Sequence, residues 1–246
     1  MIVGFVGAGN MAEAMARGWV GEFEGVLFSD GGSGRARQLA KELGGEAVSN
    51  QEMARRADLV VLAVKPNRLG DVAPELAEAR EVVSVLAITT LEQLRAALPT
   101  AEHVLRLMPN VAVEVRRGVL CVAGSVSDRV WGKLSTLGQI VEIPEEDFDA
   151  ATAVMGCSPA YIALAVEAIA DAGAADGLDP QLARELVVAT AAGTAELLRR
   201  HEPAELRKAV ASPGGATEAG LEALGREDAA AAFTAAVEAS LERMRG

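Results

Sequence analysis

Residues Ile2 to Met15 read IVGFVGAGNMAEAM and indicate the fold class of the chain. The apolar run Ile2 to Val6 predicts a strand, and the alanine-rich pattern that follows predicts a helix. Between them, Gly7, Gly9 and Ala12 form a GxGxxA motif. In a strand–turn–helix unit, the first glycine permits a tight turn, the second lets the backbone approach a phosphate, and the small third residue allows close helix packing. The motif therefore predicts a dinucleotide site at the helix N-terminus, where free N–H groups attract anions.

The first part of the chain continues this alternation of strand and helix patterns, which is typical of a parallel sheet in an α/β domain. Thr90 and Gln93 have the spacing of a capping box and predict a further helix start. We predict helices over Met11 to Val20 and Ala36 to Leu43, and strands over Ile2 to Val6, Val26 to Ser29, Leu59 to Val64, Val82 to Val85, His103 to Leu107, Val119 to Val122 and Ile140 to Ile143.

After Pro144 the strand patterns end and helical periodicity continues to the C-terminus. We therefore predict two domains, an α/β Rossmann-like domain over 1–148 and an all-helical domain over 149–246. The segment Pro180 to Arg200 is apolar around most of its circumference, so a partner subunit is expected to cover it. The predicted helices are Ser158 to Ala172, Pro180 to Arg200, Pro203 to Val210, Thr217 to Leu224 and Asp228 to Arg245.

Composition narrows the class of protein. Half of the 246 residues are hydrophobic and only 3% are aromatic, which favours a core of closely packed helices. The net charge of −12, without a basic patch, argues against nucleic-acid and anionic-lipid partners. Cys121 and Cys157 lack metal-ligand spacing and suit a reducing compartment. We expect a cytoplasmic protein with no signal peptide, no membrane span and no metal site.

The choice of dinucleotide stays open at this stage. Asp30 at the end of the second strand suits a ribose 2′-hydroxyl, whereas the nearby Arg35 and Arg37 could neutralise a 2′-phosphate or lie on an ordinary solvated helix start. Lys65, which follows the strand Leu59 to Val64, would lie at the carboxyl edge of the sheet where ligands bind. We interpret Lys65 as a cofactor contact, with a plain surface lysine as the alternative.

A second glycine-rich stretch, ASPGGATEAGLEAL, covers Ala211 to Leu224. Consecutive glycines leading into a helix at Thr217 predict a rigid turn whose N–H groups attract a small carboxylate. The alternative is a plain turn between two helices.

Together these motifs resemble those of the pyrroline-5-carboxylate reductase family, and the resemblance covers nearly the whole chain. It rests on GFVGAGNMAEAM at the start, AVKP at Ala63 to Pro66, LMPN at Leu107 to Asn110, PAY at Pro159 to Tyr161 and SPGGAT at Ser212 to Thr217. It implies reduction of the C=N bond of 1-pyrroline-5-carboxylate to L-proline, with NADP(H) favoured and NAD(H) possible. It also implies a homodimer or a higher assembly of dimers, in which the helical domain serves dimerisation and substrate binding.

The resemblance further implies the roles of individual residues. Thr217 is the expected catalytic residue, since its hydroxyl would reach the ring nitrogen; its alternative role is the N-cap of the following helix. The substrate residues are Ser212, Gly214, Gly215, Ala216 and Thr217. The cofactor residues are Val6, Gly7, Ala8, Gly9, Asn10, Met11, Ser29, Asn50, Ala63, Val64, Lys65, Pro66 and Ala87.

The chain departs from the family pattern at Ser158 and Ile88, where glycine is commoner, and at Asp30 with the GGSG that follows it. Two other functions compete with the reductase. A 3-hydroxyacid dehydrogenase would carry a catalytic lysine on a helix of the second domain, and the only lysine there, Lys208, matches no such motif. A non-catalytic dinucleotide-binding scaffold is the other alternative, which the intact SPGGAT turn argues against.

Overall fold

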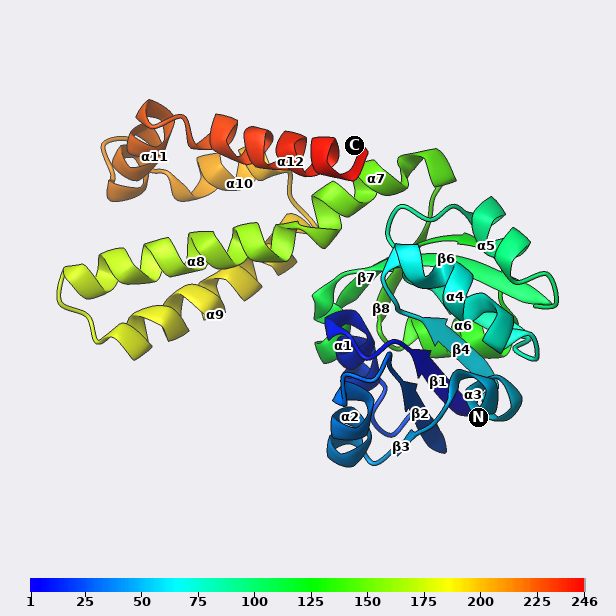
Figure 1. Ribbon diagram of the computed structural model, residues 1–246. Coiled ribbons are helices and arrows are strands. Elements are labelled where there is room, and N and C mark those ends of the chain that lie inside the picture. Colours follow the sequence, from blue (N-terminus) through cyan, green and yellow to red (C-terminus); the bar gives the residue numbers. More distant parts are fainter. Residues whose placement is uncertain (246) are drawn as a thin grey trace. The chain divides into compact units, whose positions relative to one another are not determined.

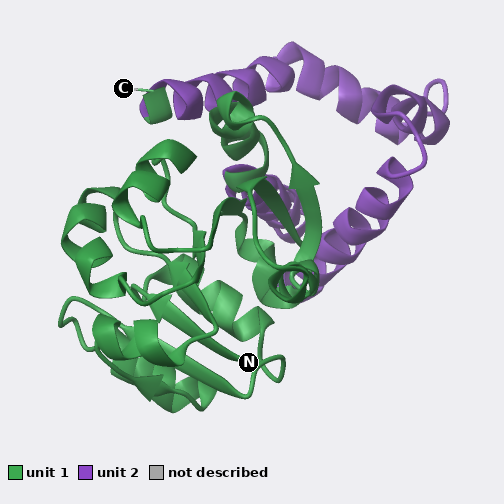
Figure 2. Ribbon diagram, turned by 90° about the vertical axis from the view of Figure 1, so that its right-hand side faces the viewer, with its two compact units in different colours: residues 1–156, 244–246 green, residues 157–243 purple. Residues whose placement is uncertain are grey.

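The computed structural model describes residues 1–245 and divides into two compact units (Figure 2). The first contains Met1–Gly156 together with the C-terminal end from Met244, and the second contains Cys157–Arg243. The sequence places its boundary at Phe148, in the short helical segments just before this division. The separate functions assigned to the two parts stay predictions.

The first unit is built on an eight-stranded sheet in the order β3-β2-β1-β4-β5-β6-β7-β8 (Figure 1). Neighbouring strands are parallel except β6 and β7, which are antiparallel. Residues 110–117 join these two, and that connection is shorter than the dozen or so residues that a parallel crossover requires. The strands are β1 (Ile2–Val6), β2 (Gly25–Ser29), β3 (Glu46–Ala47), β4 (Leu59–Leu62), β5 (Glu81–Ser84), β6 (His103–Pro109), β7 (Gly118–Gly124) and β8 (Gly138–Glu142).

Helices connect these strands. The predicted capping box is confirmed, since the Thr90 hydroxyl accepts the Gln93 N–H at 3.2 Å and the Gln93 side chain accepts the Thr90 N–H at 2.9 Å. The α-helices of this unit are α1 (Asn10–Gly18), α2 (Arg35–Leu43), α3 (Asn50–Arg56), α4 (Leu69–Val72), α5 (Leu91–Ala97), α6 (Asp128–Ser135) and α7 (Phe148–Ala151). Short 3₁₀ segments η1 (Pro66–Arg68) and η2 (Ala73–Leu76) flank α4.

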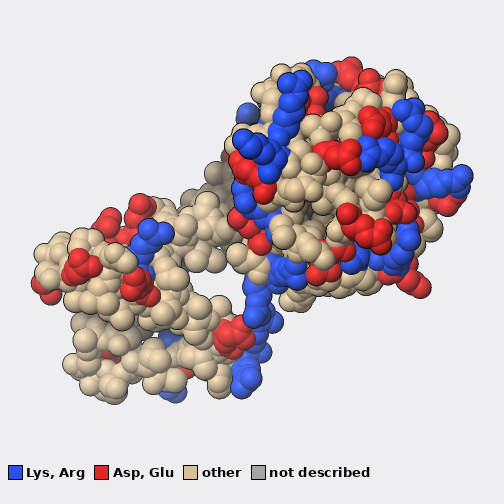
Figure 3. Space-filling model, turned by 90° about the horizontal axis from the view of Figure 1, so that it is seen from below, with Lys and Arg blue, Asp and Glu red and all other residues tan. Residues whose placement is uncertain are grey.

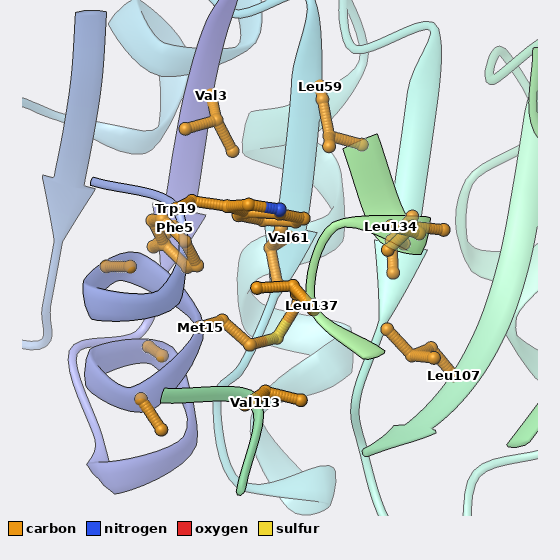
Figure 4. Close-up of a cluster of buried hydrophobic side chains, with 14 of the residues drawn as sticks. Val3, Phe5, Met15, Trp19, Leu59, Val61, Leu107, Val113, Leu134 and Leu137 are labelled. Carbon is orange, nitrogen blue, oxygen red and sulfur yellow. The ribbon is translucent and has the colours of Figure 1, made fainter. Parts of the chain in front are cut away.

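A buried apolar cluster fixes α1 against the sheet (Figure 4). Met15 and Trp19 of α1 pack with Phe5 of β1 and Val61 of β4, and all four are at most 1% exposed. The Trp19 indole N–H donates to the Lys133 carbonyl at 2.9 Å, so the one polar atom of this side chain is satisfied. Burial of these side chains holds the N-terminus of α1 beside the end of β1, where the glycine-rich turn lies.

The second unit consists of helices alone. They are α8 (Ser158–Ala175), α9 (Pro180–Leu198), α10 (Pro203–Val210), α11 (Ala216–Arg226) and α12 (Ala229–Arg245). α8 and α9 pack against each other as a hairpin, and the Asp179 carboxylate caps α9 by accepting the Leu182 N–H at 3.0 Å. The helices predicted from the sequence are therefore present, with ends that differ by a few residues.

Much apolar side-chain surface of this unit faces outward. In α8 and α9 only Ala170 and Ala183 are buried. The exposed large side chains of these two helices are Ile162, Leu164, Ile169, Leu182, Leu186, Val188, Leu197 and Leu198. In the view of Figure 3, this unit, on the left, shows mainly uncharged residues, whereas the first unit shows closely mixed charges. The apolar surface expected around α9 is thus observed.

The successive helical segments over residues 145–175 are together long and apolar enough to be a candidate membrane span by length and composition. Only 11% of its most apolar window is buried within the chain. Helices that cover a subunit interface have the same composition, because they too bury apolar surface outside their own chain. The expected absence of a membrane span stays a prediction.

Candidate active site

A cavity of about 840 Å³ opens where β1, β2 and β4 end. Ligands of open α/β sheets bind at this carboxyl edge, and small-molecule pockets typically measure roughly 300–1,000 Å³. The cavity is lined by Val6, Gly7, Ala8, Gly9, Asn10, Ser29, Asp30, Gly31, Ser33, Arg35, Asn50, Ala63, Val64, Lys65, Arg68, Asp71, Val72 and Glu75. All the expected cofactor residues are in this set except Met11, Pro66 and Ala87.

Gly7 forms the tight turn after β1. Its φ is +101°, and its N–H donates to the Ser29 carbonyl at 3.0 Å. A Cβ atom at this position would lie 2.5 Å from the carbonyl oxygen of Ala63, so a side chain cannot be accommodated without moving the backbone. Gly7 is therefore required by the fold itself, because three strand ends converge here.

Gly9 has a different reason to be glycine. Its φ of −79° and ψ of −178° are open to any residue, and a Cβ atom there would meet no protein atom within 4 Å. That Cβ atom would project into space at the mouth of the cavity. Gly9 is also the N-cap of α1, and in residues 1–245 no side chain caps this helix end. The N–H groups of the first turn are therefore free to bind an anion such as a pyrophosphate.

Ser29 and Asn50 lie together on the β2 side of the cavity. The Ser29 hydroxyl, in a residue only 4% exposed, donates to the Asn50 side-chain oxygen at 2.5 Å. The Asn50 amide in turn donates to the Glu75 carboxylate at 2.7 Å. The neighbouring Ser49 caps α3 by accepting the Glu52 N–H at 3.1 Å, which fixes where the Asn50 side chain starts. These contacts bring two of the sequence-predicted residues into one polar group that suits an adenosine ribose.

The remaining predicted cofactor residues differ in position. Lys65 precedes η1, and its exposed side chain lines the cavity. Met11 packs against the apolar core, whereas Pro66 and Ala87 are exposed outside the cavity lining, and the roles assigned to these three stay predictions. Next to Ala87, Ile88 has a φ of +61° and is 61% exposed. A β-branched residue is strained in this left-handed region, so the departure noted at Ile88 has a conformational cost.

The predicted substrate turn belongs to the second unit. Gly214 has a φ of +72°, and the Gly215 N–H donates to the Ser212 carbonyl at 2.9 Å, which closes a tight turn before α11. The Gly214 N–H donates to the Glu218 carboxylate at 2.6 Å. One amide of the expected anion site is therefore already bound by a carboxylate of the chain itself.

Thr217 is exposed and is the second residue of α11. The alternative role predicted for it was wrong, because Gly215 is the N-cap and Thr217 already has helical geometry. Thr217 instead borders a shallow apolar depression together with Ile169, Gly220, Leu221, Ala223, Leu224 and Glu227. Its hydroxyl is thus placed at the rim of an apolar surface.

Two family models match the chain. The model described as pyrroline-5-carboxylate reductase dimerisation matches residues 145–246. The model described as NADP oxidoreductase, coenzyme F420-dependent, matches residues 2–88, which contain the glycine-rich turn and most of the cavity lining.

Curated relatives match over nearly their full length. The pyrroline-5-carboxylate reductase of Synechocystis is 34% identical over 258 residues, which cover 98% of this chain and 96% of the relative. That of Thermus thermophilus is 36% identical, with 99% and 97% covered. The chain belongs to the pyrroline-5-carboxylate reductase family. The family predicted from the five motifs is thereby confirmed.

A solved structure agrees with this assignment. The structure described as Plasmodium falciparum pyrroline carboxylate reductase with NADP bound superimposes with a TM-score of 0.86 at 28% identity, and covers 99% of this chain and 97% of that one. The predicted fold class, a Rossmann-like domain followed by a helical dimerisation domain, is confirmed.

Four residues between β4 and β5 that line the cavity of this reductase-family chain were missed from the sequence. They are Arg68, Asp71, Val72 and Glu75, which lie on the helical turns between β4 and β5. The sequence shows charges after Lys65 and Pro66, but a short charged segment without clear periodicity does not reveal which side chains turn towards the cleft. In residues 1–245 no group of three or more His, Cys, Asp or Glu side chains could hold a metal ion.

Proposed function

We propose that this chain reduces the C=N bond of 1-pyrroline-5-carboxylate to L-proline with NADP(H) as the hydride donor. The observation that carries the proposal is the full-length match to pyrroline-5-carboxylate reductases, combined with a cavity at the sheet edge lined by the glycine-rich turn. The dehydrogenase and scaffold alternatives are not favoured, because the relatives that span the chain are reductases by name.

The cavity suits a dinucleotide. The amides at the N-terminus of α1 would hold the pyrophosphate, and the open space beside Gly9 lets it approach the backbone. Ser29 and Asn50 would hold the adenosine ribose, while Ala63, Val64 and Lys65 would border the nicotinamide side. When bound, the reduced nicotinamide supplies the hydride. The contribution of these residues is to orient it and to exclude water.

The turn from Ser212 to Thr217 would hold the substrate carboxylate, through the Ser212 side chain and the N–H groups of Ala216 and Thr217 at the start of α11. The Thr217 hydroxyl would orient the ring nitrogen or relay a proton to it. Since a protonated imine is already electrophilic, positioning supplies much of the acceleration and no strong acid is needed.

The proposal extends to the assembly and the location of the protein. The matched dimerisation model and the apolar surface of α8 and α9 support a homodimer, or a larger assembly of dimers, in which a second copy completes the substrate pocket. Both cysteines are free, which suits a reducing cytoplasm.

The direct test is to mix purified protein with NADPH and 1-pyrroline-5-carboxylate and to follow cofactor oxidation and proline formation. Turnover supports the reductase, whereas cofactor binding without turnover would favour the scaffold. Thr217→Ala should lower kcat/KM by about 10- to 100-fold, as expected for loss of a hydrogen bond to a reacting group. Thr217→Ser keeps the hydroxyl and should retain most activity. Equal activity in all three proteins would remove Thr217 from the mechanism.

A further inference from the structure

The end of β2 carries the features that would distinguish NADP(H) from NAD(H). Val6 of β1 pairs with Ser29 of β2, so the loop after Ser29 lies directly beside the glycine-rich turn. This loop contributes Asp30, Gly31, Ser33 and Arg35 to the cavity lining. In doubly wound sheets the adenosine ribose binds here, and an acidic residue or an arginine at this position meets its 2′ substituent.

Asp30 is already engaged within its own loop. One of its carboxylate oxygens accepts the Gly32 N–H at 2.9 Å, and the other accepts the Ser33 hydroxyl at 2.8 Å and the Ala36 N–H at 2.9 Å. The hydrogen bond from Ala36, partly opposed by burial, holds the pKa of Asp30 below its usual value. Gly34 is the N-cap of α2 and has no side chain, so Asp30 supplies the cap. Its carboxylate orders the loop and is little available to a ribose hydroxyl.

Arg35 is placed differently. It is the first residue of α2, it lines the cavity, and its side chain is 38% exposed. One of its terminal nitrogens contacts the Glu13 carboxylate of α1. The other oxygen of Glu13 accepts two N–H groups from Arg17, at 3.0 and 2.8 Å. Glu13 therefore keeps a cationic partner when the Arg35 guanidinium turns into the cavity, which lowers the cost of that movement.

The other cations near the cavity are less suited to this position. Arg68 is paired with Asp71 at 2.8 Å, and both residues belong to the segment after β4. Lys65 also follows β4, on the side of β1 away from β2. Arg37 is exposed and does not line the cavity.

We propose that Arg35 binds the 2′-phosphate of NADP(H) and is the residue that makes this chain prefer it over NAD(H), with Asp30 acting only to order the loop. The inference rests on the proposed function, because it assumes that the cavity holds a nicotinamide dinucleotide. A planar guanidinium can make two parallel hydrogen bonds to a phosphate, and a single flexible lysine cannot reproduce that geometry.

The test uses two fragments that differ by the phosphate alone, 2′,5′-ADP and 5′-AMP, with binding to the full chain measured by calorimetry. Arg35→Ala should raise the dissociation constant of 2′,5′-ADP by about 10- to 100-fold, the range for a charge-assisted contact. It should change the dissociation constant of 5′-AMP by less than about twofold. Arg37→Ala, two residues along the same helix, is the matched control and should change neither. Unchanged 5′-AMP binding also shows that the variant is folded.

Three results would overturn the inference. They are an equal loss for both fragments, no loss for either, or a larger effect of Arg37→Ala. Kinetics with 1-pyrroline-5-carboxylate distinguish failure of the Arg35 inference from failure of the reductase assignment. Arg35→Ala should raise KM for NADPH and leave KM for NADH and both kcat values nearly unchanged. A wild-type protein that binds 2′,5′-ADP through Arg35 but never reduces the imine would refute the reductase and leave this inference standing.

Discussion

At the scale of single residues, Gly7 and Gly9 show why two glycines of one motif cannot be treated alike. Gly7 has no room for a Cβ atom within the protein, whereas Gly9 has open space beside it. Mutation should therefore separate a structural requirement from a binding requirement.

Gly7→Ala should lower the free energy of unfolding by roughly 2–4 kcal/mol, from left-handed strain and the clash with Ala63. Gly9→Ala should leave the unfolding transition in place and weaken NADPH binding by about 10-fold or more, since the added methyl group occupies phosphate space. Urea unfolding and calorimetric titration measure the two effects. Unaltered NADPH affinity in Gly9→Ala would contradict the assigned pyrophosphate position.

Ile88 is strained at a position that the family usually gives to glycine. Because the side chain is 61% exposed at a φ of +61°, little apolar burial compensates for the strain. Ile88→Asn should raise the free energy of unfolding by about 1 kcal/mol, since asparagine tolerates this region. Ile88→Val retains the branched carbon and should give no gain. Equal stability of the Asn and Val variants in urea would show that the backbone relaxes at little cost.

At the scale of elements, the loop from Asp30 into α2 should respond to pH. The pKa of the Asp30 carboxyl is lowered in the folded protein, chiefly by the hydrogen bond from Ala36. A carboxyl with a lowered folded pKa stabilises the protein above its unfolded pKa of about 3.9, and this contribution is lost as the pH falls through the folded value. Stability should therefore decline below about pH 4 partly through Asp30.

Asp30→Asn should weaken this decline, and unfolding free energies from urea titrations between about pH 3 and 6 would measure it. Asp176→Asn is the control, since in the described residues the Asp176 carboxylate has no hydrogen bond or ion pair and is exposed. A pH profile of Asp30→Asn identical to that of the wild type would show that the loop contributes nothing to acid sensitivity.

Elements with strong hydrophobic patterns were predicted well. The apolar β-branched runs located all strands but β3, whose two residues are too few to form a pattern. α3 was missed because its sequence NQEMARR is mostly polar, although Ser49 and Glu52 have the spacing of a helix start. The antiparallel pairing of β6 and β7 depends on the short connection over residues 110–117, and hydrophobic patterns do not reveal the direction of a strand.

The site was also predicted only in part, because sequence patterns reveal motifs but not how loops fold around a cavity. Residues in sequence motifs, such as Gly7, Gly9 and Lys65, lie at the cavity as expected. Glu75 lines the cavity because the helical turns after β4 bring it next to Asn50. The role of Asp30 as a loop cap depends on hydrogen bonds that the sequence does not specify. The contribution of a second copy to the site stays a prediction.

At the scale of the whole molecule, the exposed apolar surface of α8 and α9 should control assembly. We expect the wild-type chain to sediment as a dimer or larger, and Leu186→Glu, at a position 51% exposed on α9, to raise the dissociation constant by about 10-fold or more. Val20→Glu, 56% exposed in the turn after α1, is the control and should not change the sedimentation profile. A monomeric wild type, or equal dissociation of both variants, would contradict this role.

The contact between Glu218 and Gly214 has a consequence for how the turn meets its ligand. The chain's own carboxylate already occupies that N–H, so the loop is aligned before anything arrives and little ordering entropy remains to be lost on binding. An incoming anion that uses the Gly214 N–H has to displace the Glu218 carboxylate and is repelled by its negative charge. The turn is thereby biased towards small anions that are satisfied by the Ala216 and Thr217 amides alone.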